Sequence, residues 1–139
     1  MWCKFDIMKH LAIFKQPFLD LILNGEKTVE SRFSRVKCAP FGRVSKGDTV
    51  LLKSVGGPVC GEFVVRQVRS ISDATPEIIE GLKNFSREIC SNKDESFWSD
   101  RKDSKYVTLI WVGSPRKYAH PYPFVKKDRR GWVVLGADY

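Results

Sequence analysis

The sequence has few residues that bind metal ions and no pair of closely spaced cysteines. Its histidines are His10 and His120, and its four cysteines, at positions 3, 38, 60 and 90, stand more than twenty residues apart. A zinc site needs clustered Cys or His ligands, so we expect neither a metal site nor another cofactor. Scattered cysteines without a signal peptide are typical of reduced, mostly buried thiols, and we therefore expect a cytoplasmic protein.

The sequence also lacks a hydrophobic run long enough to cross a membrane. The apolar stretch near its start, residues 18–23, is interrupted by Asp20, whereas a transmembrane helix needs about 20 apolar residues. We find no internal repeat and no low-complexity segment. With 139 residues, of which 42% are hydrophobic and 29% charged, the chain has a globular composition, and we expect one domain over residues 1–139.

The charge is basic and unevenly distributed. The formal net charge is +8; residues 1–70 carry 12 positive and 6 negative side chains, residues 71–104 carry 5 and 8, and residues 105–139 carry 7 and 2. We expect the two basic ends to share one face and the acidic middle to lie elsewhere. This pattern suits RNA or DNA, because contacted phosphates release counterions. It equally suits an ordinary soluble surface, and charge does not decide between the two.

The order of elements predicts a small β-barrel with few helices. An apolar run at 11–14 predicts a strand, and residues 17–25 predict a short helix that begins near Pro17 and ends before Gly25. Thr75 predicts the start of a longer helix, which we expect to run to Cys90. Further strands are expected at residues 28–33, 50–52, 62–68, 106–112 and 132–135, with loops at 34–48 and 118–123. The prediction is therefore a mixed α+β fold of five or six strands, with helices packed at the barrel openings.

One short motif carries groups that bind ligands or move protons. In the expected strand at 28–33 the side chains of Thr28, Glu30 and Arg32 share one face, because side chains alternate along a strand. Lys27 lies at the junction of helix and strand and can lean over the barrel mouth. Arg32 offers forked donors to a phosphate or carbonyl, Glu30 can hold Arg32 or move a proton, and Lys27 can contact phosphate. A surface cluster without function has the same residue types and spacing.

Residues 16–32 resemble the ASCH domain, a branch of the PUA-like superfamily. The resemblance rests on Gln16-Pro17 followed by the pattern Gly25-x-Lys27-x-x-Glu30-x-Arg32. It implies a PUA-like β-barrel with a cleft beside the motif, lined by Gln16, Lys27, Thr28, Glu30 and Arg32. PUA-like relatives use such clefts to bind RNA or a modified base.

The same resemblance also implies an alternative function as an enzyme. Some small ASCH proteins resemble hydrolases that deacetylate N4-acetylcytidine with a lysine and, three positions later, a threonine nucleophile; others are described as ribonucleases. Lys27 matches that lysine, whereas Glu30 occupies the threonine position. If the protein is an enzyme, Lys27 and Glu30 are the catalytic candidates; the sequence leaves open whether it is one.

The residues before the last expected strand form a second basic cluster. Lys126, Lys127, Arg129 and Arg130 lie close to Trp132, a mixture that suits contact with a nucleic-acid backbone. A solvated turn has the same composition, and we expect Trp132 itself to lie in the core. The sequence thus predicts a module that binds RNA or a nucleoside and has no membrane segment. DNA, an acidic peptide and the hydrolase activity remain as alternatives, and the oligomeric state is open.

Overall fold

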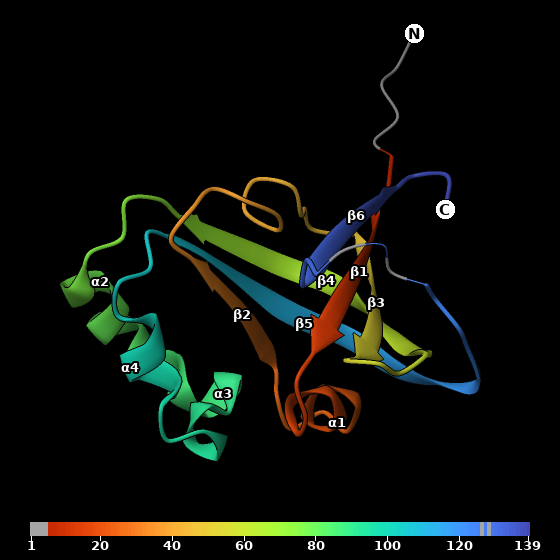
Figure 1. Ribbon diagram of the computed structural model, residues 1–139, viewed down its shortest axis with the longest axis horizontal. Helices are drawn as coiled ribbons and strands as arrows, with labels where there is room; N and C mark the ends of the chain where they lie inside the picture. Colours follow the sequence, from red (N-terminus) through yellow and green to blue (C-terminus); the bar gives the residue numbers. More distant parts are fainter. Residues whose placement is uncertain (1–5, 126, 128) are drawn as a thin grey trace, which may run out of the picture.

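The computed structural model describes residues 6–125, 127 and 129–139 of the chain. Its centre is a curled six-stranded half-barrel sheet in the order β2-β5-β4-β3-β1-β6 (Figure 1). The strands are β1 (Lys9–Phe14), β2 (Val29–Ser34), β3 (Thr49–Ser54), β4 (Val59–Ile71), β5 (Tyr106–Tyr122) and β6 (Trp132–Gly136). β1 and β3 run parallel, and the other neighbours are antiparallel. The predicted mixed α+β, PUA-like fold is confirmed.

The strand predicted at 106–112 is much longer in the structure. β5 has 17 residues and pairs with β4 as far as Tyr122. The expectation of an aromatic loop at 118–123 was therefore wrong for residues 118–122. The register between β4 and β5 is irregular at two places that each contain one of the two prolines of β5. Pro115 lies in the β5 segment opposite β4 residues 62–64, and Pro121 lies in the β5 segment opposite β4 residues 59–61. A proline in a bulge breaks no regular ladder hydrogen bond, so the strand continues.

The helices are short and lie mainly beside β2. α1 (Phe18–Leu23) stands alone below the sheet, whereas α2 (Pro76–Gly81), α3 (Ser86–Ile89) and α4 (Phe97–Arg101) form a group at one side (Figure 1). Thr75 caps α2 as expected, since its hydroxyl accepts a hydrogen bond from the backbone N–H of Ile78 at 3.3 Å. Among the described helices, none has the length and hydrophobicity needed to cross a membrane.

The continuous helix expected from Thr75 to Cys90 was wrong. The segment is divided into α2, the 3₁₀ helix η1 (Leu82–Phe85) and α3, and a second 3₁₀ helix, η2 (Ser91–Lys93), follows. Because a 3₁₀ turn has three residues, it rotates the following side chains relative to an α-helical pattern. Before this turn, in α2, Ile79 is buried, while its neighbour Ile78 is 40% exposed. Cys90, with a φ of 63°, ends the segment where it was expected to end.

A buried chain of polar groups fixes β1, β6 and the turn before β3 to one another. Trp132 Nε1 donates to His10 Nδ1 at 3.0 Å, and His10 Nε2 lies 2.9 Å from Asp48 Oδ2. Asp48 also accepts the backbone N–H groups of Met8 and Ser45. Trp132 is in the core, as predicted, with 3% of its surface exposed. This series of hydrogen bonds holds the Trp132 indole ring in place against β2.

The cysteines differ in exposure more than the sequence suggested. Cys90 is buried and Cys60 half-buried, but Cys38 is exposed, so the expectation of mostly buried thiols was wrong for that residue. Cys3 lies outside the described residues. Within the described part of the chain, no three side chains of His, Cys, Asp or Glu gather as a metal site would require.

Candidate functional site

The backbone between α1 and β2 directs Lys27 inward. Gly25 adopts a φ of 83°, a left-handed conformation that glycine tolerates, and turns the chain back toward the sheet. The backbone N–H of Lys27 then donates to Leu21 O at 2.9 Å, and that of Thr28 donates to Glu88 O at 3.0 Å. Lys27 is thereby held between α1 and α3, and its side chain is only 2% exposed.

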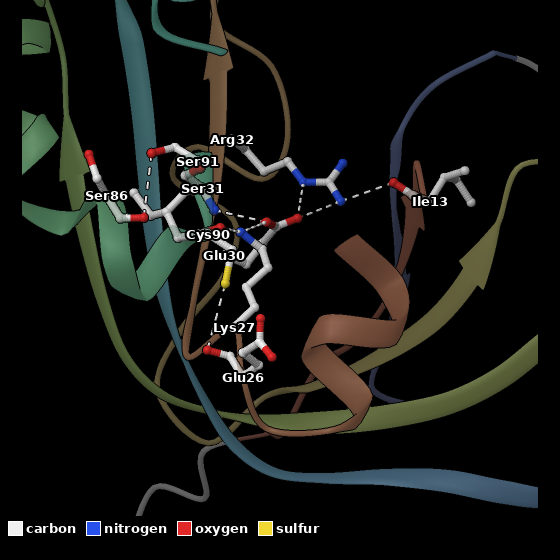
Figure 2. A network of polar contacts seen from close by, with 10 residues as sticks. Ile13, Glu26, Lys27, Glu30, Ser31, Arg32, Ser86, Cys90 and Ser91 are labelled. Carbon is white, nitrogen blue, oxygen red and sulfur yellow. Dashed lines mark hydrogen bonds and ion pairs between the residues drawn. The ribbon is translucent and has the colours of Figure 1, made fainter. Parts of the chain in front are cut away.

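Lys27, Glu30 and Arg32 form one buried network (Figure 2). Glu30 Oε2 accepts from Arg32 Nε at 2.9 Å and also lies 2.9 Å from Arg32 Nη2, and Glu30 Oε1 lies 3.4 Å from Lys27 Nζ. The backbone N–H of Ser31 also donates to Glu30 Oε1 at 3.0 Å, and Lys27 Nζ donates to Ile89 O at 2.5 Å. The predicted Glu30–Arg32 pair is therefore present, and Lys27 joins it.

Burial and the two cations set the charge of the network. Burial lowers the pKa of Lys27 from its ordinary value, although the neighbouring Glu30 carboxylate acts in the opposite direction. Burial by itself would raise the pKa of Glu30, but Arg32 and Lys27 together outweigh it and hold the pKa below 4.5. Glu30 is thus a carboxylate at neutral pH, fixed by donors from both sides.

Arg32 links β2 to the opposite edge of the half-barrel. Its Nη2 donates to Ile13 O at 3.0 Å, and its Nη1 donates to Gly131 O at 3.2 Å. The guanidinium also lies over the rings of Phe14 and Trp132, at 4.9 and 5.3 Å from their centroids. Such planar, multiply bonded contacts suit arginine and not lysine. Arg32 therefore joins the edge strand β2 to β1 and to the residue before β6.

The three charged groups line a cavity of about 500 Å³, which we call the Lys27 cavity. Its wall comes from the end of β1, α1, β2 and the α4 region. Ile13, four phenylalanines and eight further polar or charged residues complete it: Ile13, Phe14, Phe18, Phe33, Phe97, Lys15, Ser31, Ser34, Arg35, Asp94, Asp100, Arg101 and Ser104 are all on its surface.

Two predicted site residues lie away from this cavity. Gln16 is exposed and binds the start of α1, where its Oε1 accepts the backbone N–H of Asp20 at 3.2 Å. Thr28 is exposed, and it is not among the residues that line the cavity. Their predicted role in binding is not supported by this geometry.

The basic cluster directly precedes a residue that Arg32 contacts, Gly131. Lys127, Arg129 and Arg130 are exposed, and they directly precede Gly131, whose carbonyl accepts from Arg32. Lys126 was predicted with them but lies outside the described residues. The cluster is therefore beside the Lys27 cavity, although it does not line it.

Sequence reasoning missed the wall formed by the acidic middle of the chain. Asp94 and Asp100 line the cavity, and Asp94 lies 3.5 Å from Lys15, so part of this segment does not lie elsewhere as we expected. Arg101 lies over the Phe97 ring at 3.8 Å and donates to Phe97 O at 2.9 Å. The signal in the sequence was the cluster of aromatic and charged residues at 94–101.

The curled sheet, with short helices at its open side and a charged cavity between them, defines a PUA-like β-barrel protein. Residues 13–78 match the model of the ASCH domain, so this part of the chain is an ASCH domain. The match covers the motif and the strands β2 to β4, while α3, α4, β5 and β6 lie beyond it.

Solved structures support the fold over most of the chain. An ASCH protein from Zymomonas mobilis has a TM-score of 0.68 at 13% identity, covering 91% of this chain and 87% of that one. A point variant of the same protein has a TM-score of 0.69 at 14% identity, covering 94% and 89%. A protein from Enterococcus faecalis V583 has a TM-score of 0.55 at 10% identity, covering 82% and 84%. No curated protein matches the sequence.

The Glu30 network makes the free energy of unfolding of the protein depend on pH. The folded-state pKa of Glu30 lies below 4.5, so its contribution is complete above pH 4.5 and is lost as the pH falls through the folded value. We expect Glu30→Gln to lower the free energy of unfolding by about 3 to 5 kcal/mol at pH 7, because two buried cations lose their partner. The difference from the natural protein should shrink below pH 4.5. Urea unfolding at pH 7 and pH 3 measures both; a constant difference would contradict the charge assignment.

Proposed function

We propose that this protein binds single-stranded RNA and accepts one base or modified base in the Lys27 cavity. The observation that carries the proposal is the convergence of Lys27, Glu30 and Arg32 on one cavity at the open side of the sheet. The ASCH domain and its PUA-like fold favour the same class of ligand. The described elements would then act together as one binding module.

The cavity has the size and the surface that a nucleotide needs. Its volume of about 500 Å³ lies within the range of roughly 300 to 1,000 Å³ found for small-molecule sites. The rings of Phe14 and Phe33 offer apolar contact for a base, while the Glu30 carboxylate and the arginines offer hydrogen bonds to its edge. Aromatic and polar groups together are the usual means of recognising a base removed from its stack.

The charge of the cavity favours an anionic ligand. Among its lining residues, cations outnumber carboxylates by five to three: Lys15, Lys27, Arg32, Arg35 and Arg101 against Glu30, Asp94 and Asp100. The exposed cations at 127, 129 and 130 add to this excess outside the mouth. A phosphate entering from that side meets a positive field, which raises both affinity and association rate.

The salt dependence of RNA binding tests the role of the basic cluster. We expect the double variant Lys127→Ala with Arg129→Ala to weaken binding to a hexanucleotide and to reduce the slope of log K against log salt concentration by about 1.4, since each single-strand phosphate contact contributes about 0.7. Fluorescence anisotropy between 50 and 300 mM KCl, roughly the range in which such slopes are resolved, provides the measurement. An unchanged slope would exclude these two residues from phosphate contact. The same sequence as DNA shows whether the 2′-hydroxyl matters.

A hydrolase remains a second candidate because of the surroundings of Lys27. Burial lowers the pKa of this lysine, which brings its amine closer to acting as a base. Ser31 lines the same cavity, and its hydroxyl oxygen is buried without a hydrogen-bond partner. Glu30, in contrast, occupies the position of the threonine nucleophile in the N4-acetylcytidine hydrolases that small ASCH proteins resemble, and it is engaged by Arg32. The reaction would therefore need a hydroxyl from another position.

A further inference from the structure

A second cavity lies on the other side of Ile13. It has a volume of about 550 Å³ and is lined by the β3–β4 turn, by Ile13 and by the residues after β5. We call it the Lys53 cavity; its lining comprises Ile13, Lys53, Val55, Gly56, Gly57, Pro58, Pro123 and Phe124. Ile13 also lines the Lys27 cavity, so the two cavities share one wall.

Lys53 is a buried cation without a carboxylate partner. The residue is 5% exposed, and its Nζ donates to Gly57 O at 2.6 Å and to Ser54 O at 3.3 Å. Among the described residues, Lys53 takes part in none of the ion pairs, whereas Lys27, which is buried more completely, faces Glu30. Two carbonyls occupy two of the three ammonium N–H groups, which leaves one donor and the positive charge for an anion.

The rim of the Lys53 cavity is apolar and exposed. Val55 is 78% exposed on the β3–β4 turn, and Val125, next to Phe124, is 86% exposed. Phe124 itself is half-buried and lines the cavity. A lining that combines a lysine with an aromatic ring and aliphatic side chains suits a ligand that joins a phosphate to a flat, largely apolar group.

A single segment of the chain connects the two cavities. Residues 123–131 begin with Pro123 and Phe124 at the Lys53 cavity and end with Gly131, which accepts the hydrogen bond from Arg32 at the Lys27 cavity. The exposed cations at 127, 129 and 130 lie between these ends. A strand of RNA that follows this segment would meet a cavity, a series of cations and then a second cavity.

We infer that the Lys53 cavity is a subsite for a second nucleotide of the bound RNA strand. Lys53 contacts a phosphate oxygen of that nucleotide, and Phe124 with Val55 contacts its base. The inference rests on the proposed function, because it assumes that the Lys27 cavity takes the first nucleotide. It extends the proposed function in two ways. The smallest ligand that fills both sites is a dinucleotide, and Lys53 recognises its second nucleotide.

Comparing mononucleotides with dinucleotides tests the subsite. Titration calorimetry on the full chain would use the four nucleoside 5′-monophosphates, followed by dinucleotides that begin with the nucleotide that binds most tightly. We expect the dinucleotide to bind with an affinity about tenfold or more above that of the mononucleotide, because it adds one stacked base and one phosphate contact. Lys53→Met should remove most of this gain and leave mononucleotide affinity unchanged.

Two further variants keep the test independent of folding. Val55→Asp adds a negative charge at an exposed position of the rim and should also remove the dinucleotide gain. Ile78→Asp makes the same change at an exposed position on α2 and should leave both affinities unchanged. Equal affinities for the two ligands in the natural protein, or an equal loss of both in Lys53→Met and Val55→Asp, would overturn the subsite. Absence of binding by any mononucleotide or RNA would instead overturn the proposed function.

Discussion

Replacing Arg32 with lysine is expected to abolish most of the binding at the Lys27 cavity while the charge is kept. We expect RNA affinity to fall about 100-fold and the free energy of unfolding to fall by about 2 to 4 kcal/mol, as for other buried and multiply bonded ion pairs. Both effects arise from the shape of the guanidinium. Lysine carries a compact ammonium on a flexible stem and cannot replace a planar fork.

The contacts of Arg32 explain why a conservative change has such a large effect. Arg32 holds Glu30 Oε2 with two nitrogens and at the same time donates to the carbonyls of Ile13 and Gly131. It also fills the space between the rings of Phe14 and Trp132. An ammonium can satisfy at most part of this set, so Glu30 loses donors and the edge of β2 loses its connection to β1.

A matched variant separates the effect of position from that of residue type. Arg69→Lys makes the same change on β4, where the arginine is exposed and does not line the cavity. We expect its unfolding free energy and its RNA affinity to remain within about 0.5 kcal/mol of the natural values. Urea denaturation and fluorescence anisotropy provide both quantities. Equal effects of the two substitutions would show that Arg32 has no special role.

The local features of the site were predictable because they depend on neighbours in the sequence. Alternation along a strand placed Glu30 and Arg32 on one face, and they meet at 2.9 Å. The glycine after α1 predicted the turn that brings Lys27 inward, and Gly25 has the expected positive φ. Residues two to five positions apart are related by backbone geometry alone, so a single sequence is enough to place them.

The long-range features were not predictable from the sequence. Ile89 O and Gly131 O, which bind Lys27 and Arg32, lie 62 and 99 residues away from their partners. The wall with Asp94 and Phe97 depends on where a set of broken helices packs, and no periodicity encodes that position. The length of β5 depends on bulges that accommodate two prolines, whereas prolines in a sequence ordinarily indicate the end of a strand.

The two buried lysines, Lys27 and Lys53, have different surroundings, and this difference defines the path that we propose for the RNA strand. Lys27 is neutralised in part by Glu30, so its cavity combines a cation with an acceptor and suits a base with polar edges. Lys53 is bound to carbonyls, so its cavity offers a donor and suits a phosphate. An RNA strand presents these two kinds of group in alternation, and the segment 123–131 runs from one cavity to the other.

Replacing Lys27 with methionine is expected to separate binding from hydrolysis. Methionine keeps an unbranched apolar side chain. It removes the ammonium, whose Nζ lies 5.3 Å from the Phe18 ring centroid and whose charge burial disfavours, so we expect the stability to change by no more than about 1 to 2 kcal/mol. Glu30 keeps its donors from Arg32 and Ser31 and stays ionised. The direct loss is one donor and one positive charge in the cavity. RNA and mononucleotide affinity should therefore fall about 10- to 100-fold.

The same variant tests the hydrolase directly. The natural protein, Lys27→Met and the control Lys93→Met, a lysine in the exposed ion pair with Glu26, are incubated with N4-acetylcytidine and with single-stranded RNA. For a binding module we expect no release of acetate and no RNA cleavage by any of them, and weaker RNA binding by Lys27→Met alone. Turnover by the natural protein that falls about 100- to 10,000-fold in Lys27→Met would make this lysine a general base or acid and would overturn the binding-only interpretation. Turnover that all three proteins share would show that the Lys27 amine is not a catalytic group of that reaction.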